Sequence, residues 1–471
     1  MNKQLLKRNE CIVWYNRPQD GVVFTCLKEK KDFISLRGIQ AWLWTQLSKA
    51  YSISELRGLI RKNKTHMQYS HKIESIIKPL IRKGVLKYST DGQDSKSAVF
   101  PQKYRKYNEF YLNLSHELNS AKDFNKSQNL NLYHQNSIHS SHRHFEKNEI
   151  TVSHVYREAH PALGGMSYGA RLFRKLNSIK KIKPQSTIVE VGGGTGFLTH
   201  SFLEEYRRNN RTKILPKYAC CDLSFKFLKN QRDVNESHHL NYCQANAECM
   251  PFKDSSLDLI IANENIADFT AVKLNKKETL DFLGDKIELS AIKDPSVRKS
   301  LYWVKFASLD ISDATPEFIF NLGAVEFITR IKRILKIGGL AFIAEYGAMD
   351  SYPTAVYLRG HVEYSIQFNH LIRITEALGM RIEIHSLTDF LGFKKNISVI
   401  DSCSLGFLYE MLKKDKIDLP FLAYTKEMLR REVPKRVGYF NNLKFVELTQ
   451  KSVCHNLNKF YVLLIFKGGE A

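Results

Sequence analysis

Apolar and polar positions in the first 95 residues follow short strand and helix periods. Apolar runs bounded by turn-forming residues predict strands, and apolar residues three and four apart predict helices. Ser52 and Glu55 have the spacing of a capping box, which predicts the start of the second helix. The predicted strands are Cys11–Tyr15, Val22–Leu27, Asp32–Ser35 and Val85–Tyr88, and the predicted helices begin near residues 39, 53 and 71, the third ending at Gly84.

A different pattern begins near residue 186 and continues to the end of the chain. The β-branched run Thr187–Val191 stops at a glycine cluster, and a helix-compatible run starts at Phe197. Strand and helix patterns then alternate, which favours a doubly wound parallel sheet. A helix is expected to open at residues 361–371 and to end at Gly379, and the apolar run 460–467 is expected to be an antiparallel closing strand. The predicted fold class is therefore α/β, preceded by a small α+β domain.

These patterns predict three regions. Residues 1–95 form the small domain, 96–150 a polar linker rich in Asn, Ser, Lys and His, and 151–471 the α/β domain. Within the α/β domain, residues 273–312 and 401–458 are expected to be largely helical insertions, and the second of these is a candidate peptide groove.

Composition adds a strong positive charge. The chain has 471 residues and a net charge of +23, which favours an anionic partner such as nucleic acid, an acidic peptide or a membrane surface. The alternative is a lysine- and asparagine-rich composition without functional meaning. No apolar run approaches the roughly 18 residues that span a bilayer, and no signal peptide is visible, so a cytoplasmic location without membrane contact is expected. The cysteine and histidine spacings predict no metal site.

The glycine cluster follows an acidic residue, and no P-loop Gly-Lys-Ser/Thr comes after it. The turn resembles motif I of the class I S-adenosylmethionine (SAM) dependent methyltransferases. The resemblance implies that SAM is the cofactor and that the acidic residue and the glycines hold its amino-acid end. The residues concerned are Glu190, Gly192, Gly193, Gly194 and Gly196.

Further landmarks follow in the order expected for such a domain. Asp222, with Leu223 beside it, ends the second strand, where a carboxylate can accept both ribose hydroxyls. Asn246 and Ala247 resemble the Asp–Ala pair that reads the adenine amino group in ubiquinone-type SAM methyltransferases. Asn replaces Asp here but keeps a carbonyl acceptor. Asn263 ends the fourth strand, facing the expected position of the methyl group.

Candidate catalytic residues lie around that position. An amine or hydroxyl acceptor needs a base, whereas a carboxylate acceptor does not. The candidates are Glu264, His361, Glu363 and Tyr364. A segment before the first strand has the placement of a helix that closes over SAM and substrate, and its candidate substrate contacts are His154, Tyr156, His160 and Tyr168.

Two stretches of the small domain carry a second resemblance. Residues 35–44 (SLRGIQAWLW) and 77–86 (IKPLIRKGVL) are similar to the PqqD-like winged-helix fold. That family binds the leader of ribosomally made precursor peptides as an added strand at a sheet edge, a mode called β-augmentation. Residues 1–90 contain 18 Lys or Arg and 6 Asp or Glu, which suits an acidic leader. The resemblance implies a methyltransferase that modifies a captured precursor peptide.

Other functions stay open at this point. A winged helix can also bind DNA or RNA, and the second predicted helix carries Arg57, Arg61, Lys62 and Lys64. The Asn/Asp-Pro-Pro-Tyr motif of amino-group nucleic-acid methyltransferases does not follow the fourth strand. A small-molecule methyltransferase and a non-catalytic SAM-binding protein are the remaining alternatives. The sequence predicts no oligomeric state.

Overall fold

The computed structural model describes residues 5–9, 12–17, 22–27, 33–47, 50–89, 150–212, 214–357, 362–414, 416–417, 419–433, 440–441, 443–448 and 456–468. The chain divides into two compact units, one comprising Met1–Phe110 with Ser398–Cys454 and the other Tyr111–Ile397 with His455–Ala471. In the described ranges, no helix combines the length and apolar character needed to cross a bilayer.

The second unit is built on one large sheet. Its strands are β7 (Thr187–Val191), β8 (Lys217–Asp222), β9 (Asn241–Gln244), β10 (Leu257–Asn263), β13 (Leu335–Ala348), β17 (Arg381–Ser386) and β21 (Phe460–Phe466), in the order β17-β21-β13-β10-β7-β8-β9. Strands β13, β10, β7, β8 and β9 are parallel, and β21 is antiparallel to both of its neighbours. The predicted α/β sheet with an antiparallel closing strand is confirmed.

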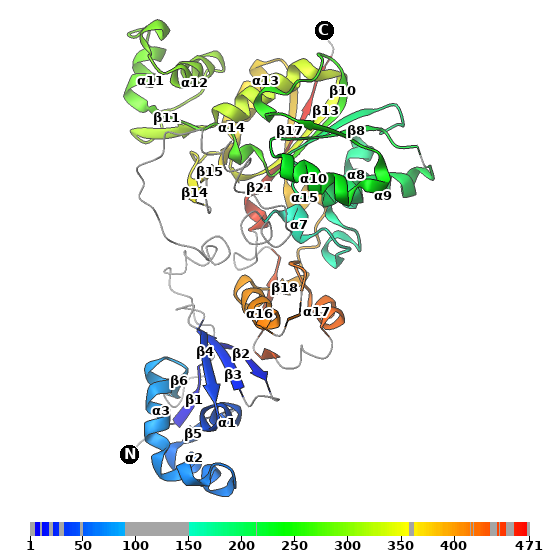
Figure 1. The fold of residues 1–471 in the computed structure, drawn as a ribbon. Helices are drawn as coiled ribbons and strands as arrows, with labels where there is room; N and C mark the ends of the chain where they lie inside the picture. The colour runs from blue at the N-terminus through cyan, green and yellow to red at the C-terminus, as the bar shows by residue number, and fades with distance from the viewer. Residues whose placement is uncertain are drawn as a thin grey trace. The chain divides into compact units, whose positions relative to one another are not determined.

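Helices cover both faces of this sheet (Figure 1). On one face lie α8 (Tyr168–Ile179), α9 (Phe197–Asn210) and α10 (Phe225–Val234), and on the other α13 (Leu322–Ile334) and α14 (Phe368–Ala377). The apolar faces of α13 and α14 bury Phe327, Ile331 and Leu371 against the strands. The parallel strands therefore end together at one edge, where ligands bind in open α/β sheets.

Two further segments of this unit bear on the sequence predictions. Half of residues 273–312 lie in α11 (Lys276–Leu283) and α12 (Pro295–Phe306), and the paired strands β11 (Val272–Asn275) and β12 (Glu317–Phe320) flank these helices. The sequence predicted a helix opening at residue 361, and this is wrong. Strand β15 (Val362–Tyr364) instead pairs with β14 (Ala355–Tyr357), β16 (Ile366–Gln367) pairs with β13, and α14 begins only at Phe368.

The first unit contains the strands and helices predicted for residues 1–95. One sheet has the order β5-β1-β6, with β1 (Leu5–Arg8), β5 (Tyr51–Ser52) and β6 (Leu86–Ser89), and another contains β2 (Ile12–Arg17), β3 (Val22–Leu27) and β4 (Phe33–Arg37). The helices are α1 (Ile39–Gln46), α2 (Ile53–Lys62) and α3 (Ile73–Arg82). The predicted capping box is confirmed, because Glu55 N donates to Ser52 Oγ (3.2 Å) and Ser52 N to Glu55 Oε2 (2.7 Å).

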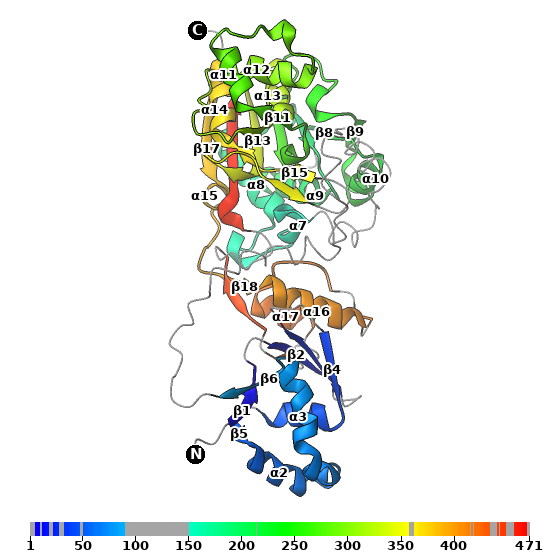
Figure 2. The ribbon, with the colours of Figure 1, turned by 90° about the vertical axis from the view of Figure 1, so that its left-hand side faces the viewer.

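Residues 398–454 belong to this first unit, although the sequence placed 401–458 in the α/β domain as an insertion. They form β18 (Ser398–Ile400), α16 (Ser402–Lys414), α17 (Lys426–Glu432), β19 (Phe440–Asn441) and β20 (Phe445–Glu447). Strand β19 pairs with β2, giving the order β19-β2-β3-β4, and α16 contacts β2 (Figure 2). These long-range contacts group the segment with the N-terminal residues.

Candidate functional site

The glycine turn between β7 and α9 has a backbone that needs glycine at three positions. Gly192, Gly194 and Gly196 have φ values of 64°, 52° and 89°, in the left-handed region that side chains disfavour. A Cβ on Gly192 would lie 2.6 Å from Asn265 Nδ2, and one on Gly196 would lie 2.8 Å from Gln231 Cα. The turn is therefore packed tightly from behind, which fixes the backbone at the end of β7.

Glu190 lies behind this turn and is only 1% exposed. Its carboxylate accepts hydrogen bonds from Tyr218 OH (2.6 Å) and from Thr199 Oγ1. Burial raises the pKa of Glu190, and the two hydroxyl donors oppose that rise. The resemblance implied that Glu190 helps to hold the amino-acid end of SAM. The structure directs its carboxylate to Tyr218 on β8 and Thr199 on α9, so Glu190 supports the turn from inside the domain.

Asp222 lies at the end of β8, beside the glycine turn, and is 6% exposed. Its Oδ1 accepts Ser224 N (2.9 Å) and its Oδ2 accepts Gln231 Nε2 (2.9 Å). Burial raises the pKa of Asp222 to about 7, and these two donors oppose the rise. Leu223 is half-buried next to it.

The segment after β9 continues the same edge of the sheet. Ala245 N donates to Asp222 O (3.1 Å), which places Asn246 and Ala247 beside the ribose candidate. Asn246 Oδ1 accepts Glu248 N (2.9 Å) and begins the 3-10 turn η7 (Ala247–Cys249), in which Ala247 is buried. A carboxamide oxygen has two lone pairs, so Asn246 can accept a further hydrogen bond.

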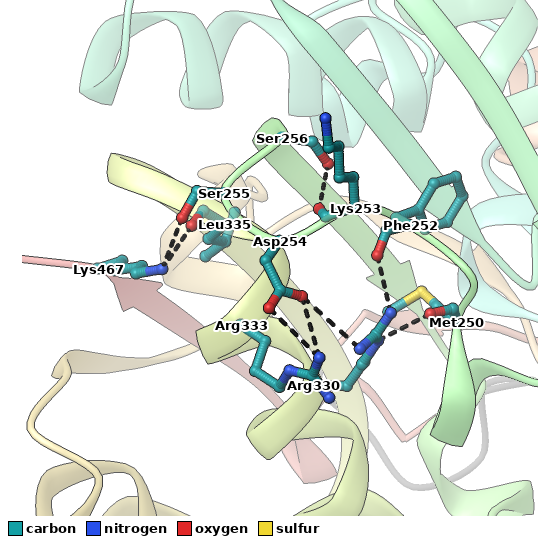
Figure 3. Close-up of polar contacts among 10 residues, drawn as sticks. All are labelled: Met250, Phe252, Lys253, Asp254, Ser255, Ser256, Arg330, Arg333, Leu335 and Lys467. Carbon is teal, nitrogen blue, oxygen red and sulfur yellow. Dashed lines mark hydrogen bonds and ion pairs between the residues drawn. The ribbon is translucent and has the colours of Figure 1, made fainter.

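The loop after η7 is held by two arginines of α13 (Figure 3). Arg330 donates from Nε to Met250 O (2.7 Å) and from Nη2 to Phe252 O (2.8 Å). Arg333 Nη2 lies 3.3 Å from both carboxylate oxygens of Asp254. The backbone that follows Asn246 is therefore anchored to α13. Neither arginine was predicted from the sequence as a site residue.

The three groups at this edge fit SAM in their chemistry and their order. Asn246 and Ala247 follow β9, Asp222 ends β8, and the glycine turn ends β7, and these strands are neighbours. This order matches the adenine, the ribose and the amino-acid portion of the cofactor. The turn brings backbone close to a ligand without a Cβ, and Asp222 supplies the acceptor that two hydroxyls need.

The end of β10 gathers polar groups from distant parts of the chain. Asn263 Oδ1 accepts Tyr168 OH (2.6 Å), and Asn263 Nδ2 donates to Ser153 Oγ (3.2 Å) and Glu264 Oε1 (2.9 Å). Glu264 has a φ of 56°, a left-handed conformation that is uncommon outside glycine. Tyr168, which was predicted as a substrate contact, is thus joined directly to the predicted methyl-facing residue.

Glu264 also anchors the short helix α7 (Val152–Val155). Its Oε2 accepts Val152 N (2.8 Å) and its Oε1 accepts Ser153 N (3.3 Å). Burial raises the pKa of Glu264 to about 7, and the charge of Glu363 adds to the rise. His154 Nδ1 lies 3.4 Å from Thr195 Oγ1 in the glycine turn. Helix α7 therefore contacts the turn, as a covering segment should.

The remaining catalytic candidates separate into three cases. Glu363 on β15 is close enough to raise the pKa values of Glu264 and Glu345. Tyr364 follows it on the same strand, so its side chain points to the opposite face. His361 lies outside the described residues. Glu345 was not predicted from the sequence as a site residue, although an acidic residue in the apolar strand β13 is a usable signal.

Tyr156 and His160 have packing and capping contacts away from the β10 end. His160 is 1% exposed and its Nδ1 accepts Ala162 N (3.1 Å), which begins the turn η5 (Pro161–Leu163). Tyr156 packs edge-on against Phe393, with ring centroids 5.2 Å apart. Both were predicted as substrate contacts, and the structure gives them buried structural contacts.

Three carboxamides that the sequence did not single out contact the glycine turn. Asn265 Nδ2 donates to Val191 O (2.6 Å), Gln231 Nε2 to Gly194 O (3.1 Å) and Asn235 Nδ2 to Gly196 O (3.1 Å). Polar residues on α10 are ordinary for an exposed helix face, so no local signal identifies Gln231 or Asn235. Where residues are described, no group of three or more His, Cys, Asp or Glu is arranged to hold a metal ion.

Residues 189–279 match a family model described as "Methyltransferase domain". A curated relative, the ubiquinone/menaquinone biosynthesis C-methyltransferase UbiE of Shewanella frigidimarina (strain NCIMB 400), is 31% identical over 101 residues, which is 20% of this chain. The chain spans 38% of the length of that relative. The chain thus carries the predicted methyltransferase domain, and the prediction of a SAM-dependent methyltransferase is confirmed at the level of this domain.

Solved structures with similarity include a phosphoethanolamine N-methyltransferase 2 of Haemonchus contortus, bound to phosphomonomethylethanolamine and S-adenosylhomocysteine. It is 15% identical with a TM-score of 0.34, covering 64% of this chain and 53% of the other. An uncharacterized protein of Burkholderia thailandensis is 14% identical with a TM-score of 0.39, covering 69% and 86%. Both TM-scores are below 0.5, so neither similarity contributes to the proposals below.

Proposed function

We propose that the chain transfers a methyl group from SAM to a ribosomally synthesised precursor peptide, whose leader is captured by residues 1–95. The observation that carries the methyltransferase part is the glycine turn, Asp222 and Asn246 at the ends of three neighbouring strands. The peptide part is supported by the sheet of the first unit.

When bound, SAM supplies an activated methyl group, so the chain's residues mainly hold and align the reactants. The glycine turn and Asp222 fix the cofactor. Glu264 is the best candidate for a proton acceptor, because its pKa of about 7 leaves a useful fraction of carboxylate near neutral pH. It would take the proton of an amine or hydroxyl acceptor. Asn263 and Tyr168, which are hydrogen-bonded together, would orient that group.

The proposed leader site is the outer edge of β4. In the order β19-β2-β3-β4, strand β19 pairs with the β2 edge, and no described strand pairs with the outer edge of β4. Ser35 and Arg37 on β4 are exposed. An extended peptide can add there through main-chain hydrogen bonds. The excess of Lys and Arg in residues 1–90 would attract an acidic leader.

Mass spectrometry tests this function. The full chain is incubated with SAM and with a candidate precursor peptide, in parallel with the same peptide lacking its leader. We expect a mass gain of one methyl group on the core, and much slower transfer without the leader, because capture raises the local concentration of the core. Equal transfer to both peptides would reject leader capture, and transfer to a small molecule alone would favour a different substrate class.

Nucleic acid is the competing partner. Arg57 of α2 forms an ion pair with Glu74 of α3 (3.0 Å), so one of the four basic residues that favoured this reading has a protein partner. A true nucleic-acid complex would weaken steeply as salt rises, since phosphate contacts release counterions. Methylation of RNA or DNA with that salt dependence would replace the peptide proposal.

A further inference from the structure

Gln231 joins two parts of the cofactor site through one side-chain amide. Helix α10 runs beside the end of β8 (Figure 1), and Gln231 is 0% exposed there. Its Nε2 donates to Asp222 Oδ2 (2.9 Å) and to Gly194 O (3.1 Å). Within the described residues, its Oε1 is buried and has no hydrogen-bond partner. A buried oxygen without a partner is costly. The two hydrogen bonds that Nε2 donates must therefore have a role that offsets this cost.

The neighbouring carboxamides show what is particular to Gln231. Asn235, one helical turn further on, donates to Gly196 O (3.1 Å), and Asn265 donates to Val191 O (2.6 Å). Gln231 and Asn235 therefore hold carbonyls of the glycine turn, and Asn265 holds the carbonyl of the residue just before it. Among these three side chains, Gln231 also donates to Asp222, whereas the Asn235 and Asn265 amides described above donate to backbone carbonyls. It thus connects the candidate ribose-binding carboxylate to the backbone that would hold the amino-acid end.

We propose that Gln231 is a positioning residue for the cofactor, which orients the Asp222 carboxylate and stabilises its charged form for the ribose hydroxyls. This rests on the proposed SAM-binding function. A carboxylate accepts hydrogen bonds from two hydroxyls, whereas a protonated carboxyl loses one acceptor position. The geometry and the charge of Asp222 both depend on the Nε2 donor.

The charges around Asp222 make its ionisation sensitive to this donor. Burial is the main cause that raises its pKa to about 7, and the carboxylates of Glu190 on β7 and Asp268 on the 3-10 turn η8 (Ile266–Asp268) add to it. Ser224 N and Gln231 Nε2 lower it. Removing the Gln231 donor therefore moves the pKa of Asp222 further upward, above neutral pH.

The test is calorimetric titration of the full chain with S-adenosylhomocysteine at several pH values from about 6 to about 9, bracketing this ionisation. Gln231→Met keeps most of the volume and removes the donor. We expect its affinity for S-adenosylhomocysteine to fall about tenfold at neutral pH, and the midpoint of the pH dependence of binding to rise by about one pH unit. Both effects follow from losing a hydrogen bond to a charged carboxylate. Asn235→Leu is the matched control, with weakened binding but an unchanged midpoint.

The outcomes separate this proposal from the proposed function. If Gln231→Met binds S-adenosylhomocysteine as tightly as the wild type and its pH midpoint does not move, the proposed role of Gln231 is wrong. The proposed cofactor site is then unaffected. A folded wild-type protein that does not bind the ligand refutes the cofactor site itself. If Gln231→Met does not fold, Gln231→Glu replaces it as the test variant. It places a second carboxyl group next to Asp222 and must also raise the midpoint of the pH dependence of binding. Asp222→Asn must abolish the pH dependence, and its persistence overturns the proposal.

Discussion

At the residue scale, the buried carboxylate of Glu190 gives a direct test of what supports the glycine turn. Tyr218→Phe removes the hydroxyl that donates to Glu190 Oε2 (2.6 Å). We expect the free energy of unfolding to fall by about 1–3 kcal/mol, since the buried carboxylate loses one of its two hydroxyl donors. Tyr206→Phe is the matched control, because its hydroxyl is buried without a partner among the described residues, and it should cost nothing. Equal effects in guanidinium unfolding would contradict this.

A second residue-scale prediction compares two glycines with similar backbones. Gly192 and Gly338 have φ values of 64° and 72°, but only the first would place a Cβ against a neighbour, 2.6 Å from Asn265 Nδ2. Both Ala variants should lose about 1–2 kcal/mol to left-handed strain. Gly192→Ala should also displace Asn265 and weaken S-adenosylhomocysteine binding, whereas Gly338→Ala should bind normally. The measurement is binding affinity beside thermal stability, and matching affinities would reject the tight packing.

The same scale shows why some site residues could be predicted and others could not. The glycine turn and Asp222 are encoded locally, since each follows directly on an apolar strand. Gln231 reaches Asp222 only because α10 packs beside β8. Such helix packing cannot be predicted from a short stretch of sequence. Asn265 likewise contacts Val191 across more than seventy residues.

At the scale of elements, Glu264 links α7 to the end of β10, and its ionisation gives this link a pH dependence. Its pKa is raised from 4.5 to about 7 in the folded protein, so the folded state binds more protons between these values. This group's contribution to the free energy of unfolding is therefore full below about 4.5 and declines as pH rises through about 7. Asp222, raised from 3.8 to about 7, acts in the same direction.

Glu264→Gln should make the stability curve flatter over this range. The variant removes one titrating group, and the decline between about pH 5 and about pH 7.5 should shrink by about 1 kcal/mol or more, while the Asp222 contribution remains. Guanidinium unfolding at both pH values measures it. An identical decline in the wild type and the variant would show that Glu264 does not titrate as described.

Elements with a strong local pattern were predicted well. The capping box at Ser52 and Glu55 and the strand Thr187–Val191 are examples. The helix predicted from residue 361 was not found at its first residues. Val362–Tyr364 form a strand instead, because they pair with β14. Tertiary pairing here overrides local preference.

At the scale of the whole molecule, the exposed edge of β4 provides a test of the peptide partner. Arg37→Glu reverses an exposed charge on β4, and Lys64→Glu reverses an exposed charge beyond α2. We expect Arg37→Glu to weaken binding of an acidic leader several-fold and Lys64→Glu to change it little, with S-adenosylhomocysteine affinity unaffected in both. Fluorescence anisotropy with a labelled leader measures this. A larger loss in Lys64→Glu would point to α2 and to the nucleic-acid reading.

The membership of residues 398–454 could not be predicted from the sequence. Their helical periods are compatible with either unit. The contacts that group them with the first unit are distant in sequence: β19 pairs with β2, more than four hundred residues earlier, and α16 also contacts β2. The methyltransferase domain could be predicted because several landmarks occur in order along one stretch of chain. Residues 398–454 carry no comparable series of sequence landmarks, because their place depends on contacts with residues far away in the sequence.

The central claim is that the glycine turn, Asp222 and Asn246 together bind SAM. The most direct measurement is a titration of S-adenosylhomocysteine into the full chain by isothermal calorimetry, with circular dichroism to establish folding. We predict saturable one-to-one binding. A correctly folded chain that gives no binding heat across temperatures would contradict it.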